Sequence, residues 1–217
     1  MENNKNLNMV TTTNTNIKII PDINAPPGID ISFGARRSLT QLFNKKFDEM
    51  TKNESRLLKH NYIKVPMVKQ NYYLMLQTEK CQKIYVTQEN VKVFMKTKFG
   101  ILLFRSPDEA YITIPSDGSV VYIKILEKKE LNLIGSTETN LLLGPSYKRE
   151  YNLVLGDKFV VSYAFCVNAL LQKKMVSAEY KYVILNQILQ ENEIPVFFGN
   201  EWNYFSKLDE WLHISGY

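Results

Sequence analysis

Two acidic residues and a lysine lie at the outer ends of two neighbouring segments that have the composition of β-strands. Asp108 precedes the first segment, and Glu127 and Lys129 lie near the end of the second. Both segments are rich in Ile, Val and Tyr, which favour strands. Asp117 and Gly118 between them predict a two-residue hairpin turn, because both central positions of such a turn need a positive φ.

This turn determines which residues oppose one another in the predicted hairpin. Directly opposed residues share one side of a sheet, with Cβ atoms about 4.5–5.5 Å apart. The predicted pairs on that side are Ser116–Ser119, Ile114–Val121, Ile112–Ile123, Ala110–Ile125 and, at the outer end, Asp108–Glu127. The apolar pairs predict a face that packs on the core, and the two carboxylates extend that face. The other side carries a mixed set, namely Glu109, Tyr111, Thr113, Tyr122, Lys124, Leu126 and Lys128.

The carboxylate pair has the chemistry of a divalent cation site. Charges beside a core are costly unless they are paired or bind a metal, and adjacent carboxylates repel unless a cation lies between them. Mg²⁺ is the natural choice, with waters and a substrate phosphate completing its shell. Lys129 is placed to orient an attacking water or to stabilise charge on the phosphate. The alternative is an ion-pair cluster where a strand emerges into solvent.

The same residues resemble the motif of the PD-(D/E)XK nuclease superfamily. Pro107-Asp108 is similar to its first element, and Glu127-Lys128-Lys129 is similar to its second. The resemblance implies that Asp108 and Glu127 bind the metal, that Lys129 is the catalytic lysine and that the backbone carbonyl of Lys128 is a further ligand. Many members add an acid from a helix before the first strand. The candidates for this extra acid are Glu54 and Glu89.

The flanking sequence, roughly residues 87–217, resembles a group of type II restriction endonucleases found in bacteria and large DNA viruses. This resemblance implies Mg²⁺-dependent hydrolysis of double-stranded DNA at a short palindrome by a homodimer, with Mn²⁺ able to replace Mg²⁺. It also implies a companion DNA methyltransferase and an intracellular, cytoplasmic location in a bacterium or in a cell infected by a virus. The chain departs from the group at Asn140, where a basic residue is expected, and near Leu131, where a polar amide is expected.

Several basic and small residues are candidates for DNA contacts. Phosphate binding needs Lys or Arg on the rim of a cleft, helped by backbone N–H groups and small polar residues. A glycine after the catalytic strand lets the backbone approach DNA closely. The candidates are Arg36, Arg37, Arg105, Gly135, Ser136, Lys148 and Arg149. For each of them, a solvated surface residue is the alternative.

The order of predicted elements favours an α/β or α+β fold with one mixed sheet. Besides the hairpin, strands are predicted at residues 101–105, 158–167 and 194–198, and helices at residues 36–62, 87–100, 144–156, 177–193 and 204–212. The first helix is expected to break near Asn53. The resemblance implies a restriction-endonuclease-like sheet of four to five strands flanked by helices.

The chain is expected to form one nuclease domain after a flexible segment. Residues 1–28 are predicted to be a tail and arm, because Asn and Thr dominate the start and prolines follow. The domain is predicted over residues 29–217, with a helical part at 35–99 and a catalytic core at 100–217. Trp202, with Phe205, Leu208 and Trp211 at helical spacing, predicts a packed face rather than a platform for stacking bases.

The composition narrows the function classes. The chain has 217 residues, 45% of them hydrophobic, so it can bury a core, and its net charge of +5 permits a polyanionic partner without requiring one. Two cysteines without CxxC spacing predict a reduced protein with no zinc site, and two histidines leave little for a His-centred metal cage. No apolar run reaches the length of a membrane span.

Two other functions stay open at this point. A repair or recombination nuclease of the same superfamily would have the same metal site and would differ in the DNA structures that it cuts. A non-catalytic DNA-binding protein would keep the fold and the basic surface, although it has no need of an Asp, a Glu and a Lys together.

Overall fold

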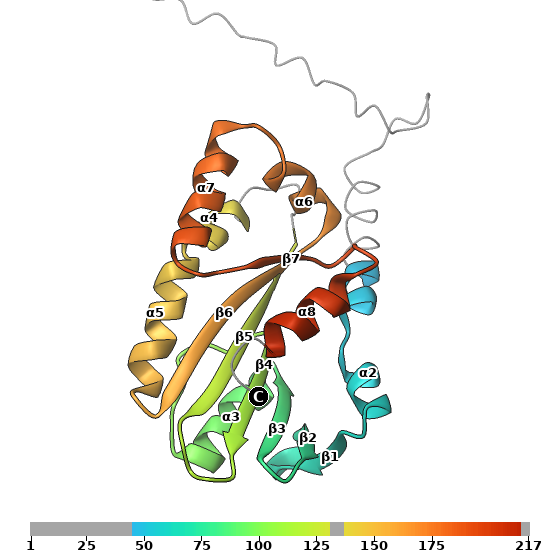
Figure 1. Ribbon diagram of the computed structural model, residues 1–217, viewed down its shortest axis with the longest axis vertical. Coiled ribbons are helices and arrows are strands. Elements are labelled where there is room, and N and C mark those ends of the chain that lie inside the picture. The colour runs from blue at the N-terminus through green and yellow to red at the C-terminus, as the bar shows by residue number, and fades with distance from the viewer. Residues whose placement is uncertain (1–44, 131–136, 214–217) are drawn as a thin grey trace, which may run out of the picture.

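A seven-stranded mixed sheet with helices on both faces forms the protein (Figure 1). The computed structural model describes residues 45–130 and 137–213. The strands lie in sequence order across the sheet, with β1 to β5 antiparallel to their neighbours and β6 and β7 added in parallel. The mixed sheet flanked by helices is therefore confirmed, whereas the prediction of four to five strands is wrong.

The elements have the following bounds. The strands are β1 (Ile63–Pro66), β2 (Tyr72–Gln77), β3 (Cys81–Thr87), β4 (Glu109–Pro115), β5 (Val121–Lys129), β6 (Phe159–Val167) and β7 (Val196–Phe198). A helix over residues 45–51 comes first, and the others are α2 (Glu54–Lys59), the 3₁₀ turn η1 (Val68–Gln70), α3 (Glu89–Phe99), α4 (Thr137–Leu142), α5 (Gly144–Leu155), α6 (Ala169–Met175), α7 (Tyr180–Glu191) and α8 (Tyr204–His213). Helices α4 and α5 lie in the crossover that a parallel β5–β6 pair requires.

The meander β1–β3 accounts for the extra strands. A strand predicted at residues 101–105 is wrong, because β3 and β5 already pair with both edges of β4. The chain leaves α3 through Gly100, whose φ of 72° suits the end of a helix. Leu102 and Phe104 then lie in a loop with 66% and 76% of their surface exposed. Apolar composition alone does not distinguish such a loop from a short strand.

Two hydrophobic layers enclose the sheet. One face packs against α3, α5, α6 and α7, which follow one another along the sheet from its lower to its upper end in Figure 1. The opposite face packs against the helix over residues 45–51, α2 and α8. The apolar side of the β4–β5 hairpin lies in the first layer, as predicted. Its other side, predicted to be a mixed set, is also covered, and Tyr111, Leu126, Glu109 and Lys124 are all buried there.

The helix over residues 45–51 ends before Asn53, as predicted for the first helix. Its buried side chains are Phe47 and Thr51, whereas Met50 is 38% exposed. The predicted residues 1–28 and the start of the helical part lie outside the described residues. Of the helices that the structure describes, none has the length and apolar character needed to cross a bilayer.

The predicted aromatic face of the C-terminal helix is partly wrong. Leu208 is fully buried, and Phe205 and Trp211 pack against the second layer. Trp202 precedes α8 and is 95% exposed. Both cysteines are buried and free, which agrees with a reduced protein.

Candidate metal centre at the end of the β4–β5 hairpin

The register predicted for the hairpin is confirmed where residues 109–113 pair with residues 122–126, but the predicted two-residue turn is wrong. The predicted pairs Ser116–Ser119, Ile114–Val121 and Asp108–Glu127 lie outside the ladder. Ala110 pairs with Ile125 and Ile112 with Ile123, and the ladder reaches Glu109 opposite Leu126 at its outer end. Residues 116–120 form a longer loop in which Gly118, with φ 73°, is the one position of positive φ. The longer loop preserves the register because the same number of unpaired residues follows Thr113 on one strand and precedes Tyr122 on the other.

The structure brings the three predicted residues together at that outer end. Oδ2 of Asp108 accepts a hydrogen bond of 2.7 Å from the backbone N–H of Lys128, and Oε2 of Glu127 lies 2.8 Å from Nζ of Lys129. Burial raises the pKa of Glu127 to about 6; the Lys129 ammonium opposes this rise, and the charge and hydrogen bonding of Asp108 add to it. The two carboxyl groups thus repel each other across a short distance, as a shared cation site requires.

The backbone of Lys128 faces the same site. In a strand, the N–H and C=O of one residue point toward the same neighbour. Because the N–H of Lys128 bonds to Asp108, its carbonyl also points to this edge, beyond the first residue of β4. Lys129 faces β6 instead, since its carbonyl accepts a bond from Asn168 N–H. The geometry therefore leaves the Lys128 carbonyl available as an oxygen ligand beside Asp108.

A second charged group lies on the opposite side of the hairpin and fixes the strand ends. Glu109 is 2% exposed and accepts hydrogen bonds from the hydroxyls of Tyr85 at 3.1 Å and Tyr111 at 2.5 Å. Nζ of Lys128 lies 2.8 Å from Glu109 and donates to the carbonyl of Thr51 at 3.3 Å. This contact holds the end of β5 against β4 and against the helix over residues 45–51.

An open cavity of about 670 Å³ lies at this end of the sheet. Asp108 and Lys129 line it, whereas Glu127 does not. Three charged residues that the sequence reasoning missed also line it, namely Asp48, Lys52 and Glu130. Burial, with the charges of Asp48 and Asp108, raises the pKa of Glu130. Asp48 and Lys52 directly follow the buried residues Phe47 and Thr51, but Thr51 is polar, so the sequence pattern does not indicate their placement.

The two predicted extra acids take different positions. Glu54 lines the cavity, but its carboxylate lies 2.8 Å from Nζ of Lys64 and accepts a bond of 3.1 Å from Tyr72. Glu89 does not line the cavity and accepts a bond of 2.8 Å from the Ser106 hydroxyl. Asp48 also lies on a helix before the first strand and lines the cavity, as Glu54 does.

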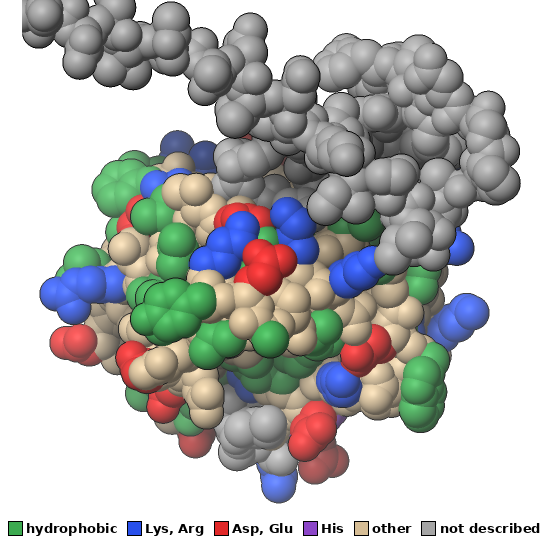
Figure 2. Space-filling model, turned by 90° about the horizontal axis from the view of Figure 1, so that it is seen from above, with side chains coloured by type: hydrophobic (Ala, Val, Ile, Leu, Met, Phe, Trp, Pro, Cys, Tyr) green, Lys and Arg blue, Asp and Glu red, His purple; other side chains and the backbone are tan. Residues whose placement is uncertain are grey.

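The described DNA-contact candidates do not line this cavity. Arg105 bonds to Glu150 at 3.0 Å and lies 4.4 Å above the ring of Tyr147. Lys148 and Arg149 line a separate cavity beside the end of α7. Gly135, Ser136, Arg36 and Arg37 lie outside the described residues. On the face that Figure 2 shows, Lys and Arg side chains alternate with Asp and Glu side chains and form no continuous basic stripe.

The donor set suits magnesium better than a metal held only by side chains. Within residues 45–130 and 137–213, no three His, Cys, Asp or Glu side chains are grouped to hold a metal ion. Mg²⁺ commonly takes one or two carboxylates and fills its octahedral shell with water and substrate phosphate oxygens. Asp108, Glu127 and the carbonyl of Lys128 fit that pattern. Comparison with protein families, with curated proteins and with solved structures found no match to this chain.

Proposed function

We propose that this protein is a Mg²⁺-dependent DNA endonuclease of the PD-(D/E)XK type that acts, like type II restriction enzymes, at a short palindromic sequence. One observation carries the proposal: two carboxyl groups and a lysine meet at the outer end of a hairpin whose register the sequence predicted. The raised pKa of Glu127 supports a binding site at these two carboxyl groups. A carboxylate with a purely structural role is usually surrounded by hydrogen-bond donors or cations, which lower its pKa instead.

The residues of this chain have separable roles in that proposal. Asp108, Glu127 and the Lys128 carbonyl hold the metal, which supplies positive charge against the phosphate oxygens in the transition state. The ammonium of Lys129, now 2.8 Å from Glu127, orients the attacking water and stabilises negative charge that develops on the phosphate. The Glu109–Lys128 pair positions the backbone that carries these groups.

A phosphodiester of DNA is the substrate that suits the cavity. The cavity is open and mostly polar, and Lys52, Lys129 and Asn140 line it beside the carboxylates. The net charge of +5 favours a polyanion. A palindromic sequence presents two equivalent half-sites, so we expect a homodimer, which light scattering after size-exclusion chromatography would measure.

Digestion of unmethylated DNA tests the proposal directly. The protein would be incubated with unmodified plasmid and genomic DNA in Mg²⁺, in Mn²⁺ and in EDTA, and the fragment ends sequenced. We expect discrete fragments in Mg²⁺ and in Mn²⁺ and none in EDTA. Asp108→Asn and Lys129→Met are expected to lower cleavage by at least about 100-fold. Asp117→Asn and Lys158→Met are the matched controls. Both residues are exposed and lie far from the site, Asp117 in the loop between β4 and β5 and Lys158 directly before β6.

The same experiment separates the alternatives. Cleavage that follows branches or ends rather than sequence would indicate a repair or recombination nuclease. Tight DNA binding without cleavage, and without Mg²⁺ binding by calorimetry, would indicate a non-catalytic protein. If a companion methyltransferase protects the same site, DNA methylated at the mapped sequence resists cutting. Full activity of Asp108→Asn would contradict the assigned roles.

A further inference from the structure

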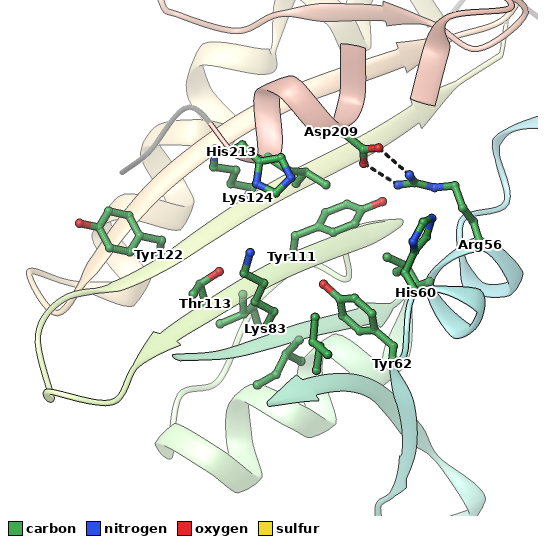
Figure 3. A pocket seen from close by; sticks show the side chains of 15 residues that line it. Arg56, His60, Tyr62, Lys83, Tyr111, Thr113, Tyr122, Lys124, Asp209 and His213 are labelled. Atoms are coloured by element: carbon green, nitrogen blue, oxygen red, sulfur yellow. Dashed lines mark hydrogen bonds and ion pairs between the residues drawn. The ribbon is translucent and has the colours of Figure 1, made fainter. Parts of the chain in front are cut away.

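A second cavity, of about 310 Å³, lies on the other side of the sheet from the apolar face of the hairpin. Strands β3, β4 and β5 form its floor, and α2 and α8 form its walls (Figure 3). It does not share Asp108, Glu127 or Lys129 with the candidate metal centre. Binding in this cavity can therefore be measured separately from the proposed nuclease chemistry.

The charged side chains that line this cavity are mostly cationic. Arg56, Lys83 and Lys124 contribute three positive charges, and both histidines of the chain, His60 and His213, also line it. Among the described lining residues, Asp209 is the one acid. Its two oxygens each accept a hydrogen bond of 2.6 Å from Arg56, so this carboxylate is occupied at the rim.

Lys124 is the most constrained of these cations. Only 5% of the residue is exposed, its ammonium donates to the carbonyl of Trp211, and Nζ lies 5.3 Å from the centre of the Trp211 ring. Burial lowers the pKa of Lys124 to about 8. A buried ammonium is costly unless it is paired, and an anion that enters the cavity would supply that pairing.

The second lysine approaches the cavity from the other side of β4. Lys83 on β3 pairs with Thr113, which pairs with Tyr122 on β5. Lys124 belongs to the adjacent row, opposite Tyr111. The two lysines thus flank β4 on one face, and two strand spacings separate them by about 10 Å at the backbone. Figure 3 shows the Lys83 side chain pointing from the sheet toward His213.

We propose that this cavity binds a small phosphomonoester, with Lys83 and Lys124 contacting the phosphate from two sides. Hydroxyl groups of Tyr62 and Thr113 and the ring nitrogens of His213 surround the same space and supply further donors (Figure 3). A volume of about 310 Å³ is at the small end of ligand sites. The size therefore favours one phosphate group with a small organic part over a stretch of duplex.

Trp211 supplies a direct reporter of binding. The chain has two tryptophans, and Trp202→Phe would remove the exposed one without touching the cavity. In that background, inorganic phosphate, adenosine 5′-monophosphate, adenosine and a short DNA duplex would each be titrated while Trp211 fluorescence is recorded, with calorimetry in parallel. We expect saturable binding of the nucleotide, weaker saturable binding of free phosphate and none of adenosine.

Matched lysine variants test the assigned contacts. Lys83→Met and Lys124→Met should each raise the Kd for the nucleotide by about tenfold or more, as loss of a charge-assisted hydrogen bond predicts. Lys96→Met, an exposed lysine on α3 across the sheet, should leave it unchanged. Two variants are used because Lys124 is buried; if Lys124→Met fails to fold, Lys83→Met decides.

Three outcomes would overturn the proposal. The first is no binding of phosphate or nucleotide by the parent protein at millimolar concentration. The second is an unchanged Kd in Lys83→Met. The third is a cavity that responds to the DNA duplex alone, which would make these lysines part of a DNA surface. None of these results depends on nuclease activity, so failure here leaves the proposed function untouched.

Discussion

Glu109, which is buried, and Glu127, which is half-buried, lie at the same end of one hairpin, and their surroundings differ in kind. Glu109 has two tyrosine hydroxyls and the Lys128 ammonium around it. Glu127 has one ammonium, that of Lys129, and faces the carboxyl group of Asp108. A carboxylate with three donors holds a structure together, whereas one placed against a like charge is prepared to bind a cation.

This difference indicates that Glu109 contributes to stability and that Glu127 is suited to bind a cation. The Glu109 side of the hairpin packs against α8 and the helix over residues 45–51. Both sides reach the cavity, because Glu109 and Lys128 line it as Asp108 and Lys129 do, whereas Glu127 lies behind them and does not line it. Binding sites commonly keep groups whose charges are not optimally paired, at some cost in stability. The comparison therefore predicts opposite responses to removal of the two charges.

The largest expected effect is on cleavage by Glu127→Gln. Loss of one metal ligand should lower the rate at least about 100-fold. The free energy of unfolding should rise slightly or stay the same at pH 7, because burial and Asp108 disfavour the ionised form of Glu127. Rates on a mapped DNA site and urea denaturation would be measured on the same preparation. A strongly destabilised Glu127→Gln protein would break the comparison.

The next effect is on stability, in Glu109→Gln. This change leaves the Lys128 ammonium buried without its counterion, and breaking such a pair costs roughly 3 kcal/mol or more. We expect a lower urea midpoint, with Glu210→Gln on the exposed face of α8 as the matched control. If Glu109→Gln and Glu210→Gln unfold at the same urea concentration, the pair around Glu109 has no structural role.

A smaller effect is expected in the dependence of stability on pH. The folded protein holds the Glu127 proton up to about pH 6, whereas the unfolded chain loses it near the ordinary value of 4.5. Between these values the folded state binds more protons, so the contribution of Glu127 to stability falls as pH rises from about 4.5 to about 6. Glu127→Gln should remove that part of the dependence, which urea midpoints at several pH values would show.

The same proton should compete with magnesium. Below about pH 6 the protonated Glu127 cannot act as an anionic ligand, so the Kd for Mg²⁺ should increase as pH falls. Calorimetric titration from pH 5 to pH 8 measures this. An Mg²⁺ affinity that does not change over that range would argue that Glu127 is not a ligand.

The sequence predicted the hairpin register because alternation of apolar residues on two strands leaves one consistent pairing. A one-residue slip would turn Ile112 and Ile123 away from the core. The predicted turn type was wrong because the register determines which residues pair, and it does not determine where the pairing stops and the loop begins. The strands β1 to β3 were missed because their polar and apolar residues do not alternate cleanly, and of the three only β3 pairs with a strand of the predicted hairpin.

The sequence predicted only those residues of the candidate site that belong to the hairpin. Asp108, Glu127 and Lys129 are positioned by local pairing, which sequence can indicate. Asp48 comes from a helix about 60 residues earlier in the chain, and its placement depends on Phe47 and Thr51 packing against the far side of the sheet. Packing of this kind across the fold leaves no periodic signal near the motif.

The smallest expected effect distinguishes the two acids that line the cavity from the N-terminal side. Glu54 is engaged by Lys64 and Tyr72, and hydrogen bonding by Lys64 lowers its pKa, so Glu54→Gln should change the free energy of unfolding by less than about 1 kcal/mol. It should also leave the Kd for Mg²⁺ unchanged.

Asp48 contributes to the raised pKa of Glu130, so its charge reaches the cavity. Asp48→Asn should weaken Mg²⁺ binding by a few-fold through loss of that negative charge. Calorimetry on the two variants side by side would decide, and a larger loss in Glu54→Gln would make Glu54 the acid that acts on the metal.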